Sequence, residues 1–234
     1  MLSIQNLNAW YGTSHVLQGI ELEVKRGELV SLLGRNGAGK TTTIKSIMGL
    51  LPKAKGQITF NGTDLLSQPA HQRFHLGLAY VPEERRIVPG LTVLENIRLG
   101  IIASKRRNQE RQVIEEIADT FPRLKERLNQ SAVTMSGGEQ QMLAIARAVA
   151  CDPDMILLDE PSEGIMPVLV DEMFELFQKL KQSGKTILLV EQNVEAALRI
   201  ADRAYIIDQG AVVHAASAAS LLADPEIQER YCAV

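Results

Sequence analysis

One short stretch of residues constrains the fold of this chain more than any other. Residues 34–42 read Gly-Arg-Asn-Gly-Ala-Gly-Lys-Thr-Thr, which fits the pattern G-x-x-x-x-G-K-[ST]. The apolar run before it, at residues 29–33, predicts a buried strand, and residues 43–48 after it predict a helix. A glycine-rich loop between a strand and a helix is the setting in which this pattern binds phosphate, so an incidental glycine-rich turn is the weaker interpretation.

The residues of this loop suit the binding of a nucleoside triphosphate. Gly34, Gly37 and Gly39 allow the backbone to curl so that successive N–H groups face phosphate oxygens, and the following helix adds the partial positive charge of its N-terminus. We expect Lys40 to reach the β- and γ-phosphates and the Thr41 hydroxyl to ligate Mg²⁺. The predicted nucleotide-binding residues of the loop are Gly34, Arg35, Asn36, Gly37, Ala38, Gly39, Lys40, Thr41 and Thr42.

A second apolar run ends in two acidic residues. Residues 155–158, Met-Ile-Leu-Leu, are typical of a fully buried parallel strand, and Asp159 and Glu160 follow at the end where α/β sheets bind ligands. We predict that Asp159 holds the Mg²⁺ shell and that Glu160 polarises a water for attack on the γ-phosphate. A solvated acidic turn would be the simpler explanation of this segment alone, but the phosphate-binding loop makes it the weaker one.

A third motif begins another helix. Residues 135–141 read Met-Ser-Gly-Gly-Glu-Gln-Gln and precede a helical run. Ser136 can cap this helix, and Gly137 and Gly138 expose N–H groups, so the helix start is a second anion site; an ordinary capped helix is the alternative. Because the first loop already forms a complete phosphate cradle, a second anion site suggests a γ-phosphate that arrives from a partner subunit.

These three motifs, in this order and spacing, resemble the ATP-binding cassette (ABC) ATPases over essentially the whole chain. The resemblance implies ATP and Mg²⁺ as cofactors, and a second cassette, identical or different, that faces the first head to tail. Ser136–Glu139 resemble the signature motif, usually Leu-Ser-Gly-Gly-Gln, which meets the nucleotide of the partner cassette. Tyr11 is similar to the aromatic residue that stacks on adenine, with a core tyrosine near a strand edge as the alternative. Residues 161–165 occupy the position of the D-loop, which lines the dimer interface in the family.

Two positions depart from the common family pattern. Glu83 stands where most members have a glutamine that touches the metal and signals to the membrane partner. Gln192 stands where most members have the switch histidine, and glutamine has no proton to exchange near neutral pH but can donate an amide hydrogen bond to a γ-phosphate. The predicted metal ligands are Thr41, Glu83 and Asp159. The predicted catalytic residues are Glu160 and Gln192.

Both departures are familiar in one subfamily. The segments 81–83, 91–96, 163–164 and 190–193 together resemble the second ATPase subunit of branched-chain amino-acid importers, although Glu84 replaces a common glycine. Urea and short-chain amide importers share much of this pattern. The predicted function is therefore ATP hydrolysis that powers a branched-chain amino-acid importer. The alternatives are the same role in a urea or short-chain amide importer, and an ABC ATPase outside transport.

The partners follow from the resemblance and from the lack of a membrane-spanning pattern. No apolar run approaches the roughly 20 residues needed to cross a bilayer, and residues 1–5 lack the features of a signal peptide. We expect transmembrane permease subunits, an indirect link to a periplasmic substrate-binding protein, and a cytoplasmic position on the inner face of the plasma membrane. The expected contact with the permease is a groove between the core and the helical region, formed by residues 83–94 and the helices at 100–125. The apolar candidates, some of which must belong to the core, are Ile87, Val88, Leu91 and Val93.

Composition and motif count disfavour the rival classes. The net charge of −3 and the pI near 5.9 argue against a broad nucleic-acid surface, so we expect no nucleic-acid partner. A single phosphate loop argues against two-cassette translation proteins, and the lack of a long coiled-coil insertion argues against DNA-repair cassettes. A small-molecule kinase would leave Ser136–Gln140 without a purpose and would need a second substrate pocket. A non-hydrolysing module is disfavoured because Lys40, Asp159 and Glu160 are all present.

The expected fold is α/β: a P-loop NTPase core with an antiparallel β subdomain and a helical subdomain. We predict one ABC ATP-binding domain over residues 1–234, with its core at about 1–85 and 150–234 and its helical subdomain at about 86–150. The antiparallel part includes a strand that ends at Asn61-Gly62, a hairpin signal. Pro122 is expected to kink or divide a long helical segment.

Overall fold

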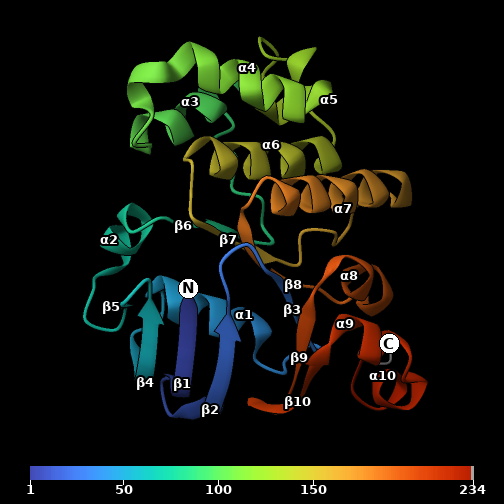
Figure 1. Ribbon diagram of the computed structural model, residues 1–234. Helices are drawn as coiled ribbons and strands as arrows, with labels where there is room; N and C mark the ends of the chain where they lie inside the picture. Colours follow the sequence, from blue (N-terminus) through green and yellow to red (C-terminus); the bar gives the residue numbers. More distant parts are fainter. Residues whose placement is uncertain (233–234) are drawn as a thin grey trace.

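The computed structural model describes residues 1–232, in which two β-sheets lie below a group of helices (Figure 1). The strands are β1 (Leu2–Tyr11), β2 (Ser14–Val24), β3 (Leu29–Leu33), β4 (Lys53–Phe60), β5 (Thr63–Asp64), β6 (Leu78–Val81), β7 (Met155–Asp159), β8 (Thr186–Val190), β9 (Arg203–Asp208) and β10 (Ala211–Ser217). The α-helices are α1 (Lys40–Met48), α2 (Ala70–His75), α3 (Val93–Ala103), α4 (Glu110–Thr120), α5 (Pro122–Lys125), α6 (Gly137–Ala150), α7 (Pro167–Gln182), α8 (Val194–Ile200), α9 (Ala218–Leu222) and α10 (Pro225–Cys232), with short 3₁₀ turns η1 (Arg107–Gln109) and η2 (Ala132–Thr134).

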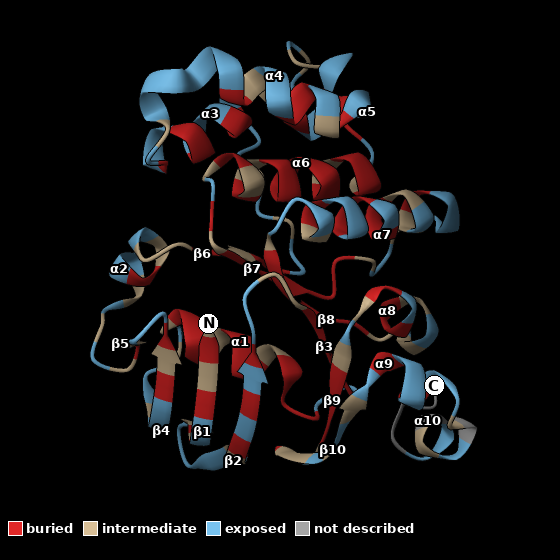
Figure 2. Ribbon diagram, viewed as in Figure 1, coloured by how far each residue is buried: buried red, intermediate tan, exposed pale blue. Residues whose placement is uncertain are grey.

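The larger sheet has the strand order β10-β9-β3-β8-β7-β6 and is parallel except for β10. Strands β3, β7 and β8 are buried along their whole length, as their unbroken apolar runs predict (Figure 2). Because the carboxyl ends of parallel strands meet at one edge, this edge collects the loops that follow β3, β6, β7 and β8. The fully buried strands expected at residues 29–33 and 155–158 are therefore confirmed.

The smaller sheet is antiparallel, with the order β2-β1-β4-β5. Its last hairpin turns at Asn61 and Gly62, which both have positive φ angles, 49° and 83°, as the hairpin signal predicts. Helix α1 lies between the sheets, and its buried Ile44 and Ile47 belong to a core that both sheets share. This core holds the helix that starts at the phosphate-binding loop.

The helices above the larger sheet form a second apolar core around α6, of which the middle is buried on nearly all sides (Figure 2). The long helical segment expected near Pro122 is divided there into α4 and α5. Thr92 and Ser136 cap α3 and α6 by capping boxes with Glu95 and Glu139. Within residues 1–232, no helix is both long and apolar enough to cross a bilayer.

Helix α3 approaches α6 closely at Gly100. A Cβ atom built at Gly100 would lie 2.2 Å from the Arg147 carbonyl oxygen, a distance that real Cβ atoms do not show. The absence of a side chain at this position therefore sets the spacing of the two helices.

Replacement of Gly100 by alanine tests this packing. Glycine to alanine inside a helix ordinarily stabilises a protein by about 0.5–1 kcal/mol. Here we expect Gly100→Ala to destabilise by about 1–3 kcal/mol, because the helices must separate. Gly90→Ala is the matched control, since a Cβ there meets nothing within 4 Å and the φ angle is not positive. Unfolding in urea measures both, and a Gly100→Ala protein as stable as the wild type would contradict the packing argument.

Candidate functional site

The phosphate-binding loop between β3 and α1 has the conformation that its glycines predict. Gly34, Gly37 and Gly39 have φ angles of 144°, 78° and 114°, which residues with side chains rarely adopt. A Cβ at Gly34 would lie 2.2 Å from the Ile207 carbonyl oxygen, so the loop also needs glycine there to pack against β9. The loop thus needs glycine both for its own backbone conformation and, at Gly34, for its contact with β9.

Lys40 joins the loop to the end of β7. Its side chain is 3% exposed, and its Nζ donates hydrogen bonds to the carbonyl oxygens of Gly34 at 2.8 Å and Arg35 at 3.2 Å. The same nitrogen lies 3.2 Å from Glu160 Oε1, which makes an ion pair. The structure therefore brings together the predicted phosphate-binding lysine and the predicted catalytic acid.

Asp159 lies under the loop and accepts two hydrogen bonds. The hydroxyl of Thr41 donates to Oδ1 at 2.9 Å, and the hydroxyl of Tyr80, on the neighbouring strand β6, donates to Oδ2 at 3.0 Å. Burial raises the pKa of Asp159, and these two hydrogen bonds oppose the rise. Burial and the charge of Asp159 raise the pKa of the Tyr80 phenol, so Tyr80 remains a donor at all working pH values.

Glu160 has an unusual backbone and a crowded side chain. Its φ angle is 47°, in the left-handed region, and its N–H donates to the Val190 carbonyl at 2.9 Å. The amide of Gln192 donates to Glu160 Oε2. Burial opposes ionisation of Glu160, but the contacts with Gln192, Glu163 and Lys40 outweigh it and lower its pKa. Glu160 is therefore ionised near neutral pH, as a proton acceptor must be.

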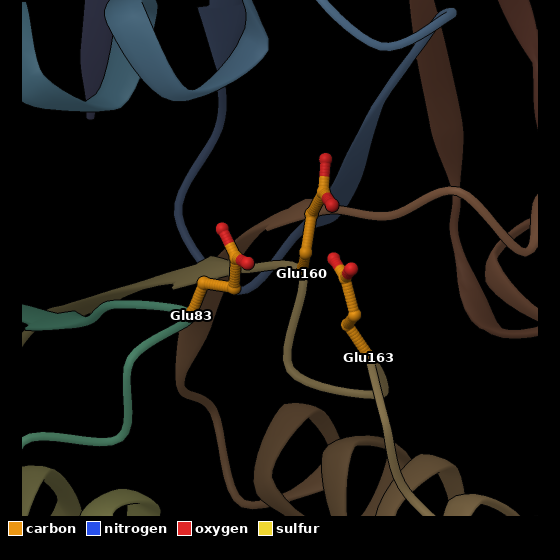
Figure 3. A group of neighbouring side chains, drawn as sticks. All are labelled: Glu83, Glu160 and Glu163. Atoms are coloured by element: carbon orange, nitrogen blue, oxygen red, sulfur yellow. The ribbon is translucent and has the colours of Figure 1, made fainter.

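Three carboxyl groups converge at this edge of the sheet (Figure 3). One oxygen each of Glu83, Glu160 and Glu163 lies within 4.8 Å of the others. The hydrogen bond with Glu160 raises the pKa of Glu163, and burial and the charge of Glu83 act in the same direction. The sequence grouped Glu83 with Thr41 and Asp159 around a metal, whereas the structure places it beside Glu160 and Glu163.

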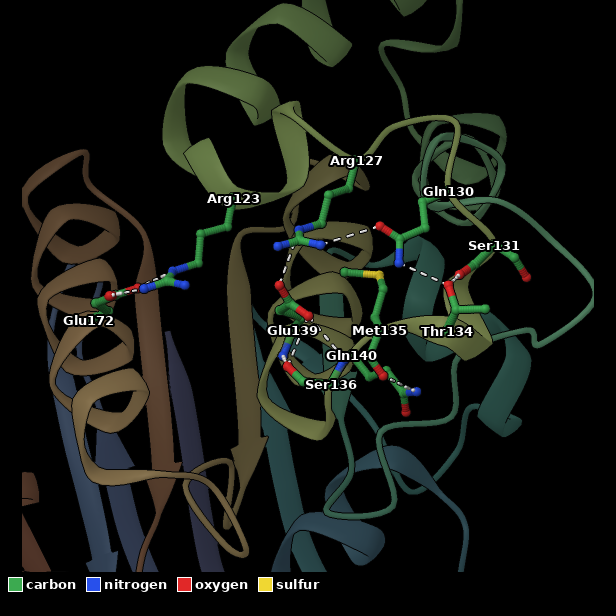
Figure 4. Close-up of polar contacts among 10 residues, drawn as sticks. All are labelled: Arg123, Arg127, Gln130, Ser131, Thr134, Met135, Ser136, Glu139, Gln140 and Glu172. Atoms are coloured by element: carbon green, nitrogen blue, oxygen red, sulfur yellow. Dashed lines mark hydrogen bonds and ion pairs between the residues drawn. The ribbon is translucent and has the colours of Figure 1, made fainter.

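The start of α6 carries the predicted signature residues, which form their own network (Figure 4). The Ser136 N–H and hydroxyl both donate to Glu139 Oε2 at 2.9 Å, and Glu139 Oε1 lies 3.1 Å from Arg127 Nε. Burial alone would raise the pKa of Glu139, but Ser136 and Arg127 lower it. Within residues 1–232, no hydrogen bond or ion pair joins this network to the phosphate-binding loop.

Arg85 lies against the same helix start. A Cβ built at Gly137 would be 2.6 Å from Arg85 Nη1, so the guanidinium covers this glycine. Arg85 has a φ angle of 62°, and none of the ion pairs found within residues 1–232 includes it. Sequence reasoning gave Arg85 no role, and its place beside the signature follows from the backbone turn after β6.

Tyr11 ends β1 with an exposed side chain. It is 46% exposed, which excludes the alternative of a core tyrosine near a strand edge. Its neighbour Trp10 stacks on His15 with ring centroids 4.5 Å apart, so the end of this hairpin is ordered by aromatic contact. The role of Tyr11 in adenine stacking stays a prediction.

Three further residues of the site had no assigned role in the sequence. Tyr80 contacts Asp159, Glu163 contacts Glu160 and Gln192, and the buried Glu191 accepts hydrogen bonds from the D-loop. Only their position in the chain could have indicated a role, because each lies near the carboxyl end of a strand, at the edge of the sheet where ligands bind. The side chains that meet there depend on strand order, which one sequence does not state.

The parallel sheet, the phosphate-binding loop and the acidic strand end define an ATP-hydrolysing cassette. The sequence profile of the ABC transporter family matches residues 17–163, and the chain belongs to this family. It is 42% identical over 231 residues to the high-affinity branched-chain amino acid transport ATP-binding protein BraG of Pseudomonas aeruginosa, with 99% of each chain covered. It is 37% identical to the probable branched-chain amino acid transport ATP-binding protein LivF of Archaeoglobus fulgidus, covering 99% of this chain and 98% of LivF.

A solved structure extends these similarities to a dimer. The ATP-binding cassette MJ0796, in a dimeric post-hydrolysis state bound to ADP and Pi, matches with a TM-score of 0.83 and 26% identity. The match covers 93% of this chain and 99% of MJ0796. The resemblance to ABC ATPases, the fold class and the ATPase activity expected from the sequence are thereby confirmed.

Tyr80→Phe tests the hydrogen bond to Asp159. Because the hydroxyl stabilises the ionised carboxylate, its loss should raise the pKa of Asp159 further and destabilise the protein by about 1.5–3 kcal/mol where Asp159 is ionised. The loss should shrink as pH falls through the pKa of Asp159. Unfolding free energies between pH 7 and pH 4 measure this dependence.

The control for this pH dependence is Tyr205→Phe. The Tyr205 hydroxyl bonds to the Glu23 backbone and the Arg203 guanidinium and touches no carboxylate. Its effect on stability should therefore change little over the same range. If both variants lose the same free energy of unfolding at every pH, the conclusion that Tyr80 donates to an ionised Asp159 is wrong.

Proposed function

We propose that this protein is the ATP-hydrolysing subunit of an importer for branched-chain amino acids. The observation that supports branched-chain amino acids as the transported substrate is the 42% identity to BraG along essentially the whole of both chains. The chemistry is carried by the Lys40–Glu160–Gln192 cluster at the edge of the sheet. In this proposal the protein works on the inner face of the plasma membrane, where it is bound to permease subunits.

Nucleotide binding falls to the loop and to α1. The N–H groups of residues 34–42 and the positive end of α1 face the phosphates, and Lys40 exchanges its carbonyl partners for phosphate oxygens. Tyr11, exposed at the end of β1, would stack on adenine. Both roles use groups that the fold already holds in place.

The oxygen atoms of Thr41 and Asp159 suit Mg²⁺. They lie 2.9 Å apart at the buried end of the loop, and hard oxygen donors are the ligands that Mg²⁺ prefers. The bound ion supplies charge neutralisation at the β- and γ-phosphates. Glu83 would reach this shell from the loop after β6, although its nearest carboxylate neighbours are Glu160 and Glu163.

Glu160 would orient the attacking water and accept its proton. Its lowered pKa keeps it ionised, and the Gln192 amide fixes the direction of the carboxylate. When a γ-phosphate takes Lys40, Glu160 loses its cation and becomes a stronger proton acceptor. Gln192 can then also donate to the γ-phosphate, which makes it a sensor without a titrating proton.

The signature residues would complete the site of a partner cassette. Ser136–Glu139 lie on a different element from the phosphate-binding loop and make no polar contact with it within residues 1–232. The dimer of MJ0796 supports pairing of two cassettes. The pair here consists of two copies of this chain or of this chain and a related one.

A groove between β6, α3 and α6 is the surface for a permease helix. It encloses about 360 Å³ and is lined in part by Leu99, which is 40% exposed; Ile102, on the same helix, is 70% exposed. The sequence named Val93 and Ile87 among the contact candidates, but Val93 is fully buried and Ile87 packs against the core. Val88, which is 37% exposed, remains a candidate, and the exposed side of α3 would add to the contact.

Replacement of Glu160 by glutamine tests the chemistry. We expect turnover to fall by roughly 10²- to 10⁴-fold, the usual contribution of a general base, while the affinity for ATP stays nearly unchanged. Without hydrolysis an ATP-bound dimer should accumulate, which size-exclusion chromatography with ATP detects. The control is Glu115→Gln, which removes only a surface ion pair with Arg111. Near-normal hydrolysis by Glu160→Gln removes Glu160 from this role.

Uptake measurements test the cargo. The protein is purified from its native membrane with its permease subunits, placed in proteoliposomes with ATP inside, and supplied with the associated binding protein. We expect ATP-dependent uptake of radiolabelled leucine that isoleucine and valine compete and urea does not, and no uptake with Glu160→Gln. Uptake of urea or a short-chain amide instead would support the alternative importer, and copurification of no membrane subunit would favour a role outside transport.

A further inference from the structure

Glu191 is a buried acidic residue that the proposed mechanism does not use. It follows β8 directly, precedes Gln192, and is 2% exposed. Its Oε1 accepts the Ser162 N–H at 3.0 Å, and its Oε2 accepts the Ser162 hydroxyl at 2.8 Å and the Gln192 N–H at 3.1 Å. Among the residues that the structure describes, no lysine or arginine forms an ion pair with it.

A carboxylate in this position is costly for the fold. Burial raises the pKa of Glu191, although the hydrogen bonds from Ser162 and Gln192 act against the rise. A buried charge without a cation destabilises a protein unless several donors satisfy it. An apolar side chain would leave the Ser162 and Gln192 donors without this acceptor, so the carboxylate serves these hydrogen bonds and not packing alone.

The three donors belong to the two loops that flank Glu160. Ser162 lies two residues after Glu160, within the D-loop, while Gln192 donates its side-chain amide to the Glu160 carboxylate. The Glu160 N–H bond to the Val190 carbonyl also joins these loops. Glu191 thus ties the D-loop to the backbone of the residue that orients the predicted base.

We propose that Glu191 is a positioning residue that holds Gln192 against Glu160 and couples it to Ser162 of the D-loop. This inference rests on the proposed ATPase role of Glu160 and Gln192. A displacement of the D-loop, which a partner cassette would contact, then moves the Gln192 amide and changes the orientation of Glu160. ATP binding depends on other residues, the loop at 34–42 and Lys40, so the coupling acts on turnover.

Glu191→Gln is the first test. Glutamine has the same shape but offers one acceptor oxygen instead of two, and its NH₂ group then faces either the Ser162 N–H or the donors on the Oε2 side, so part of the link between the two loops is lost. We expect kcat to fall by about 10- to 100-fold, because small misplacements of catalytic groups have effects of this size, while KM for ATP stays within about threefold. The control is Glu28→Gln, which removes another hydrogen-bonded carboxylate, paired with Arg203 before β3. It should lower stability without changing kcat.

Ser162→Ala is the second test and avoids an altered buried charge. The loss of one hydroxyl donor should lower kcat by about fivefold, the effect of one hydrogen bond. Because Ser162, Glu191 and Gln192 act as one unit, the double variant Ser162→Ala/Glu191→Gln should be no slower than Glu191→Gln alone. In a protein that already carries Gln192→Ala, the further change Glu191→Gln should likewise lower kcat by only a small factor.

The outcomes separate this inference from the proposed function. If Glu160→Gln hydrolyses ATP normally, the base role of Glu160, on which this inference rests, fails. If Glu160→Gln is inactive while Glu191→Gln keeps its kcat, or if the Ser162 and Glu191 effects multiply, the positioning role is overturned. Should Glu191→Gln fail to fold, an unchanged kcat in Ser162→Ala overturns the role by itself.

Discussion

The parallel pairing of β7 with β8 is the constraint on which the whole site depends. Asp159 lies opposite Val190 in this register, so the next residues, Glu160 and Glu191, leave the sheet side by side. Strand β3 pairs with the other side of β8 and delivers the phosphate-binding loop to the same edge. A shift of one residue would turn every side chain to the opposite face, so the chemistry at this edge depends on the register.

The edge assembled in this way is rich in carboxyl groups and poor in cations. The ion pair with Lys40 helps to lower the pKa of Glu160. The pKa of the neighbouring Glu163 rises instead. Two neighbouring acids whose pKa values move apart are a common arrangement in which one accepts a proton and the other holds one. The pKa shifts thus agree with the sequence in giving the acceptor role to Glu160, and they add Glu163 as its protonated neighbour.

Sequence reasoning succeeded where the information is local. The phosphate-binding loop, the acidic strand end and the break at Pro122 each follow from neighbouring residues and their backbone preferences. It gave no role to Tyr80 or Glu191, because their partners are fixed by strand order and by contacts between loops distant in the chain. It could not say which of the apolar docking candidates belong to the core, as Val93 does, since an apolar residue at a helix start looks the same whether it faces the core or the solvent.

The left-handed backbone at Glu160 has a consequence for how this chain can evolve. Only glycine adopts a φ angle of 47° without a cost, and each other residue held there loses roughly 1–2 kcal/mol. Glycine at this position would relieve the strain, but it would also leave the buried Lys40 without its carboxylate partner, and breaking such a pair costs about 3–5 kcal/mol. A cassette that no longer hydrolysed ATP would therefore gain no stability by losing this acid, and the residue can outlast the activity it serves.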